Sequence, residues 1–132
     1  DGGVLPIAGY DVVVCLGVHS QLFSLLSYMV QVLSYNVSEQ LFQGIIPYDG
    51  DVVSRLKDMN SQIVPILNTA ILKCARDKVV IGCEYDEEDP VEGAYQCITD
   101  IRSRNLTVSE QHLLWNFNPG QNVRYDMLIQ TL

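Results

Sequence analysis

Residues 11–39 read DVVVCLGVHSQLFSLLSYMVQVLSYNVSE, and this stretch decides which fold we expect the chain to adopt. Between Asp11 and Glu39 it carries no formal charge when His19 is neutral, and most of its residues are apolar. A helix that is hydrophobic on nearly every side must be covered by other helices, a membrane, a subunit or an apolar ligand. We therefore predict one long helix over residues 11–35 that forms the buried centre of a helical bundle.

Two alternatives to this buried central helix follow from the same residues. The β-branched run Val12–Val14 lowers helix propensity, so a strand at the start of the segment is also compatible with the sequence. A window from Val12 to Leu33 is about long enough to span a bilayer. It holds several Ser and Gln residues, however, and no Lys or Arg flanks it. We therefore expect no membrane span.

Helical patterns also cover the middle of the chain. A short helix is expected after Asn36, and apolar residues at helical spacing predict a second long helix over residues 51–73. Pro65 lies inside this run, so the helix is expected either to kink or to divide into two shorter helices. The apolar run Val79–Cys83 is compatible with a strand, but the sequence shows no obvious partner strand for it.

The last third of the chain carries helix-start patterns. Residues 89–92 combine a capping residue, a Pro at the first helical position and a Glu three residues after the cap, which predicts a helix to about Arg104. The same pattern predicts a helix over residues 107–115, and a last helix is expected over residues 121–132. Together these segments predict one all-α domain over residues 1–132, a bundle of about five to six helices.

Sequons and cysteines indicate an oxidising, extracellular setting. Asn36 and Asn105 each begin an N-x-S/T sequon and are predicted N-glycosylation sites. The cysteine count is even, with Cys15, Cys74, Cys83 and Cys97. A chain that starts at Asp1 without Met is expected of a mature secreted protein or of a trimmed one. We predict a secreted protein with two disulfides, Cys83 and Cys97 lying in different bridges; the alternative is a cytosolic protein with buried free thiols.

The charge of the chain excludes one class of partner. Eight basic residues against sixteen acidic ones give a net charge of −8, and nucleic-acid binding requires clustered Lys and Arg. Six of the acidic residues lie within residues 84–92. This segment is interpreted as a solvated loop, or alternatively as a docking patch for a cation or a basic partner, although it lacks the EF-hand spacing.

Catalytic and metal-binding motifs are missing from the sequence. There is no H-E-x-x-H, G-x-S-x-G, C-x-x-C, P-loop or dinucleotide-binding fingerprint. The two histidines, His19 and His112, lie among apolar residues, where a core or interfacial role is expected more often than metal ligation. We predict a protein that is not an enzyme and that has no metal site and no cofactor.

The apolar segments favour binding as the function. The leading hypothesis is a carrier that encloses an apolar small molecule or lipid between the helices at 11–35 and 51–73. Its pocket is expected to be lined by Leu22, Leu26, Met29, Leu56, Met59, Ile63 and Leu67. The alternative is an extracellular protein-interaction module, either a homo-oligomer or a binder or inhibitor of another protein, with apolar helix faces buried at the interface.

Overall fold

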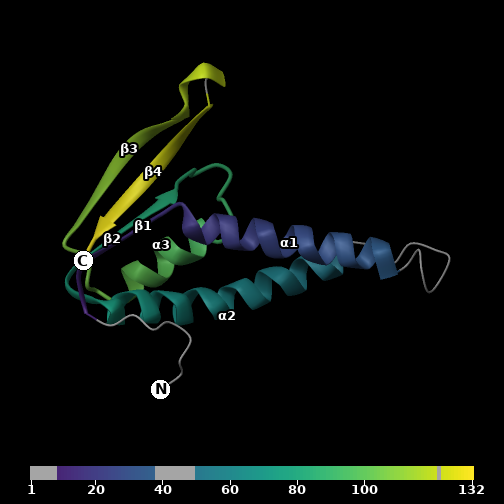
Figure 1. Ribbon diagram of the computed structural model, residues 1–132, viewed down its shortest axis with the longest axis horizontal. Coiled ribbons are helices and arrows are strands. Elements are labelled where there is room, and N and C mark those ends of the chain that lie inside the picture. Colours follow the sequence, from purple (N-terminus) through teal and green to yellow (C-terminus); the bar gives the residue numbers. More distant parts are fainter. Residues whose placement is uncertain (1–8, 38–49, 122) are drawn as a thin grey trace.

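A four-stranded sheet with helices on one side forms the architecture of this chain (Figure 1). The structure is a computed structural model that describes residues 9–37, 50–121 and 123–132. Its elements, in chain order, are β1 (Tyr10–Leu16), α1 (Val18–Val37), α2 (Gly50–Cys74), β2 (Ala75–Glu84), α3 (Ala94–Ser103), β3 (Ser109–Asn118), the 3₁₀ turn η2 (Pro119–Gln121) and β4 (Val123–Thr131).

The prediction of an all-α bundle is wrong. The described part of the chain holds three α-helices and a four-stranded mixed sheet, in the order β1-β2-β4-β3. Strands β1 and β2 are parallel, with Val14 opposite Val80, whereas β4 runs antiparallel to both β2 and β3. Two helices, α1 and α2, connect the parallel pair, which is the usual way for a chain to return to the same end of a sheet.

The decisive apolar segment is divided between a strand and a helix. Residues Val12–Val14 belong to β1, which was the alternative compatible with their β-branched side chains. Gly17 separates the strand from α1 and has a φ of 65°, a left-handed conformation that glycine adopts without steric cost. Because the chain turns at Gly17, the predicted 11–35 helix is shortened to α1, and it is not the central helix of a bundle.

Two predicted helices near the C-terminus are strands. Residues 107–115 and 121–132 were expected to be helical from their caps and apolar spacing, but they form most of the β3–β4 hairpin. In β4, Met127 and Ile129 alternate with Leu128 and Gln130, so side chains face the two sides of the sheet in turn. Pairing of β4 with both β2 and β3 overrides the local helix-start signals, because strand formation depends strongly on tertiary context.

The predicted helices in the middle of the chain agree more closely with the structure. The predicted helix at 51–73 is confirmed as α2, which continues through Pro65 without dividing. Helix α3 begins at Ala94, five residues after the predicted cap Asp89, and ends one residue before Arg104. The short helix expected after Asn36 falls mainly on residues 38–49, which lie outside the described residues.

The core lies between the sheet and the helices. Strand β2 contributes Val79, Ile81 and Cys83, and α3 covers them with Cys97, Ile98 and Ile101. Figure 1 shows that α1 and α2 run side by side and extend together beyond the sheet, while the β3–β4 hairpin projects away from the helices. Within the described residues, no helix is both long and apolar enough to cross a membrane.

Candidate functional site

Polar and thiol side chains from four elements meet in the interior of the protein. His19 is in the first turn of α1, Asn68 in α2, Cys83 near the end of β2 and Cys97 in α3. All four are almost completely buried. One ring nitrogen of His19 and the sulfurs of Cys83 and Cys97 lie within 4.8 Å of one another. We refer to these four residues as the His–Cys cluster.

A glycine allows α3 to approach α1 closely enough to form this cluster. Gly93 precedes α3 and has a φ of 83°. A Cβ atom built on Gly93 would lie 2.3 Å from the carbonyl oxygen of His19, which is much shorter than any ordinary contact. The backbone of the first α1 turn therefore rests directly on the start of α3, and this contact helps to bring His19 and Cys97 together.

Hydrogen bonds hold the imidazole of His19 in one orientation. His19 Nε2 lies 2.7 Å from Asn68 Oδ1, and because an amide oxygen only accepts, Nε2 carries the proton of this bond. The amide nitrogen of Asn68 donates to Asp100 Oδ2 at 2.9 Å, and Arg104 Nε donates to the same oxygen at 2.9 Å. His19 Nδ1 has no hydrogen-bond partner among the described residues, although it is fully buried.

The neighbouring groups shift the pKa values within the cluster. A hydrogen bond from Cys83 is the main cause that lowers the pKa of Cys97, to about 6, with His19 contributing in the same direction against the effect of burial. The pKa of Cys83 is raised by its interaction with Cys97 and by burial. Burial acts to lower the pKa of His19, but the nearby Cys97, Asn68 and Glu84 outweigh it and raise that pKa. The cluster thus favours a thiolate at Cys97.

The predicted disulfides are wrong. All four cysteines lie at described positions, and Cys15, Cys74, Cys83 and Cys97 are all free. The expectation that Cys83 and Cys97 belong to separate bridges between helices fails because Cys83 is on a strand and faces Cys97 directly. Their proximity depends on α3 packing over β2, a contact that cysteine spacing does not encode.

The residues around His19 predicted a core or interfacial role for it, and no sequence pattern pointed to the cluster. Its members are far apart in the chain, so no short spacing motif marks them. One signal was available: His19 lies three residues after the end of β1, and Cys83 is the second-last residue of β2. Parallel strands bring their carboxyl ends to the same edge of a sheet, and side chains just beyond that edge converge. Using that signal required β1 and β2 to be identified as parallel neighbours.

An exposed apolar surface follows the rest of α1. Seven large apolar side chains of this helix are between 38% and 64% exposed: Leu22, Leu25, Tyr28, Met29, Val32, Leu33 and Tyr35. The neighbouring helix α2 also exposes Met59, Ile63 and Ile66. A helix that is apolar and uncovered is unusual in a protein that acts alone in water.

The residues predicted to line an apolar pocket lie along these same two helices. Leu56 is buried, and Leu26 and Leu67 are half-buried. The other four, Leu22, Met29, Met59 and Ile63, are exposed on the surface. The structure therefore places all seven residues on α1 and α2, as predicted, but it places four of them facing solvent. The carrier hypothesis stays a prediction.

A second apolar surface lies on the face of the sheet opposite the described helices. Gly82 marks this face, because a Cβ there would meet Leu16 and Ile129. By register, Val12 and Val14 of β1 lie on the same face as Leu16, and all three are exposed. This open sheet face is an alternative to α1 as a binding surface, and a separate substitution is needed to test it.

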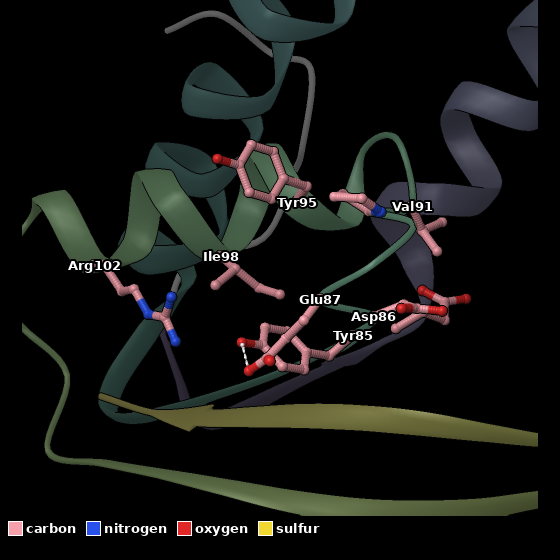
Figure 2. Close-up of a pocket in the computed structure, with 9 residues that line it drawn as sticks. Tyr85, Asp86, Glu87, Val91, Tyr95, Ile98 and Arg102 are labelled. Atoms are coloured by element: carbon pink, nitrogen blue, oxygen red, sulfur yellow. Dashed lines mark hydrogen bonds between the residues drawn. The ribbon is translucent and has the colours of Figure 1, made fainter.

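Figure 2 shows a small cleft between the acidic segment and α3. Its volume is about 180 Å³, and its lining includes Tyr85, Glu87, Tyr95 and Arg102. Arg102 is already paired with Glu110, its Nε lying 2.9 Å from Glu110 Oε1. The cleft is smaller than the usual range for small-molecule sites, and none of the predicted pocket residues lines it. It therefore gives no support to an apolar carrier.

Both predicted glycosylation sites lie at exposed positions. Asn36 is in the last turn of α1, and Asn105 follows α3 with a φ of 55°. Neither placement tests whether a glycan is attached, so both sites stay predictions.

Comparison with known proteins gives no family for this chain: no protein-family model, curated protein or solved structure matches it.

Proposed function

We propose that this protein functions as a self-associating module, in which the α1–α2 hairpins of two copies pack into an intermolecular four-helix bundle. The observation that carries this proposal is the set of seven exposed apolar side chains on α1. Completing the burial of a half-exposed Leu or Met side chain stabilises an assembly by about 1 kcal/mol. Several such side chains on each helix are enough to support a specific interface.

The spacing of the exposed residues fits contact with another helix. Leu22, Leu25, Met29 and Val32 follow one another at intervals of three, four and three residues. This is the a/d pattern of helices that pack knobs into holes, and it places one stripe along the helix. On α2, Met59, Ile63 and Ile66 continue the pattern with intervals of four and three. Both helices of the hairpin thus present a stripe of the kind that bundles bury.

Charge favours a second copy as the partner. Each chain carries a net charge of −8, so two copies repel one another over most of their surfaces. Helix α1 is the exception, because no Asp, Glu, Lys or Arg lies between Asp11 and Glu39. Two identical α1 surfaces can meet without placing like charges opposite each other, and a two-fold axis satisfies both surfaces at once. A heterologous basic partner finds no acidic side chain to pair with on α1.

Sedimentation velocity over a range of protein concentrations tests this proposal. The unmodified chain is expected to sediment as a dimer. The double variant Leu25→Glu with Met29→Glu is expected to be monomeric, because two copies would then bury four uncompensated carboxylates. Circular dichroism of the variant checks that its helices are retained. The matched control is Val108→Glu, which adds a charge at an exposed apolar residue outside both helices and is expected to leave the dimer intact.

Two further outcomes would contradict the proposal. If Val14→Glu on the open sheet face abolishes the dimer while the α1 double variant does not, the sheet is the interface and the assignment to α1 is wrong. If the unmodified chain is monomeric at all concentrations and retains a small molecule that is lost in the α1 variant, the exposed residues serve a carrier instead.

A further inference from the structure

We infer that His19, Cys83 and Cys97 form a binding site for a thiophilic closed-shell cation, Zn²⁺ or Cu⁺. Two sulfurs and one imidazole nitrogen are the donor set that such ions prefer, whereas Ca²⁺ and Mg²⁺ require oxygen donors. The three donor atoms lie within 4.8 Å of one another. This inference is independent of the proposed self-association, because the cluster is enclosed within one chain.

The spacing of the donors fits a metal ion after a small adjustment. Zinc–sulfur bonds of about 2.3 Å at tetrahedral angles place two sulfurs roughly 3.8 Å apart. Each pair of donor atoms, at most 4.8 Å apart, therefore has to close by no more than about an ångström. Side-chain rotation of Cys83 and Cys97 can supply this movement, because the strand and helix that carry them already face each other.

The imidazole of His19 is prepared for ligation. Its Nε2–H donates to Asn68 Oδ1, so the neutral ring has its lone pair on Nδ1. Nδ1 is buried and has no hydrogen-bond partner in the described part of the chain, a state that costs free energy in a protein interior. Metal-binding histidines in proteins typically use their second nitrogen in this way, to donate to an oxygen that fixes the ring. Because Nε2 is engaged with Asn68, we infer that Nδ1 is the nitrogen that would bind the cation.

The groups around the ligands are organised as a supporting shell. Asn68 is held by Asp100, and Asp100 is held in turn by Arg104, whose guanidinium also donates to the carbonyl oxygen of Pro65. This chain of bonds fixes the amide that orients His19, so Asn68 is a positioning residue.

The experiment uses the full chain, reduced and stripped of metal. Zn²⁺ is titrated in competition with a chromophoric chelator, and Cu⁺ is titrated anaerobically against a Cu⁺-specific chelator. We expect one ion per chain for the favoured cation, and the comparison of the two titrations identifies which one it is. Co²⁺ in place of Zn²⁺ is expected to give a thiolate-to-cobalt charge-transfer band, which reports sulfur ligation directly.

Variants test the individual residues. Cys83→Ser, Cys97→Ser and His19→Gln are each expected to weaken binding by more than about 100-fold, since each removes a direct ligand. Asn68→Ala is expected to weaken it by about 10-fold to 100-fold, with the charge-transfer band retained. Cys74→Ser is the matched control, because Cys74 is also a buried free cysteine but is not part of the cluster. It is expected to bind as tightly as the unmodified chain.

Several results would overturn the inference. Failure of the unmodified chain to bind either cation at one equivalent excludes the site. Unchanged affinity in a folded Cys97→Ser variant excludes Cys97 as a ligand. A Cys83–Cys97 disulfide in protein isolated without reductant, seen as a mass lower by two hydrogens, assigns the pair to redox chemistry instead. If the variants fail to fold, the X-ray absorption spectrum of the metal-loaded unmodified chain must still show two sulfurs in the first coordination sphere.

Discussion

The first turn of α1 buries polar side chains, whereas the rest of the same helix exposes apolar ones. In the first turn, His19 and Ser20 are polar, yet they are only 1% and 4% exposed. Farther along the helix, residues such as Leu25 and Met29 are apolar, yet they are about half exposed. A globular protein usually buries apolar side chains and exposes polar ones, and these residues of α1 show the reverse.

The difference lies in what each part of the helix meets. The first turn packs against α3 and β2, and its polar side chains bond to Asn68 of α2, through His19 Nε2, and to Glu84 of β2, through the Ser20 hydroxyl. The remaining turns extend beyond the sheet with α2, which is the one described helix that runs beside them (Figure 1). The buried end of α1 is therefore covered within one chain, whereas the exposed end is the surface on which we propose that a second copy packs. Four substitutions test this contrast, two of which carry a matched control.

The largest expected effect is at Gly93, which allows the start of α3 to lie against the first turn of α1. Gly93→Val places a side chain 2.3 Å from the carbonyl oxygen of His19 and forces a β-branched residue to a positive φ. We expect the free energy of unfolding to fall by at least about 3 kcal/mol, measured by urea denaturation. Gly120→Ala, where the nearest atom is 3.5 Å away, is the control and is expected to change it by less than about 0.5 kcal/mol. Equal effects at both positions would contradict the close contact.

Two buried asparagines of α2 provide the second test. Asn68→Ala removes the partner of both His19 Nε2 and Asp100, so we expect a loss of about 2–3 kcal/mol in chemical denaturation. Asn60 is also buried, but its amide nitrogen has no partner within the described residues. Asn60→Ala is therefore expected to cost less than Asn68→Ala. The reverse order would show that the network at His19 does not stabilise the fold.

A smaller loss is expected at Ser20, the other buried polar residue of the first turn. Its hydroxyl oxygen lies 2.8 Å and 2.7 Å from the two carboxylate oxygens of Glu84. Ser20→Ala leaves that half-buried carboxylate without this donor, and we expect a cost of about 1 kcal/mol in thermal or urea unfolding. A stabilising effect would mean that the polar character of the first turn is not required.

The smallest effect on the single chain is expected at the exposed end. Leu25→Gln replaces an apolar side chain that is more than half exposed in one chain. At concentrations where the protein is monomeric, the free energy of unfolding should change by less than about 0.5 kcal/mol. At concentrations where it is dimeric, the variant should be clearly less stable than the unmodified chain, because it weakens association. A large loss in the monomer would indicate that Leu25 packs within its own chain.

Local sequence signals predicted some elements of the fold well. The long helix α2 follows from its apolar spacing, and the helix start near residues 89–92 is displaced by only a few positions. The strand β1 was compatible with its three valines, but the charge-free run that follows made one continuous helix the preferred interpretation. The turn at Gly17 is the feature that separates the two, and a single glycine is a weak signal in a sequence.

The other parts of the fold depend on contacts between segments that are far apart in the chain, which local sequence patterns do not show. β3 and β4 carry residues that also suit helices. They are strands because β4 pairs with residues of β2 that precede their partners by more than forty positions. The prediction that other helices surround the apolar segment was wrong for the same reason, because a sheet forms where those helices were expected. The His–Cys cluster also requires this sheet, because α3 reaches His19 and Cys97 reaches Cys83 only when α3 lies across β2.

Native mass spectrometry of the detergent-free protein tests most directly whether α1 is buried between two copies. One spectrum reports the number of chains, and it also reveals any bound small molecule. We expect a species at twice the chain mass of 14.8 kDa, with no small molecule retained, and its conversion to single chains in the Leu25→Glu and Met29→Glu variant. A single chain at every concentration, bare or carrying an apolar ligand, would contradict the proposed dimer.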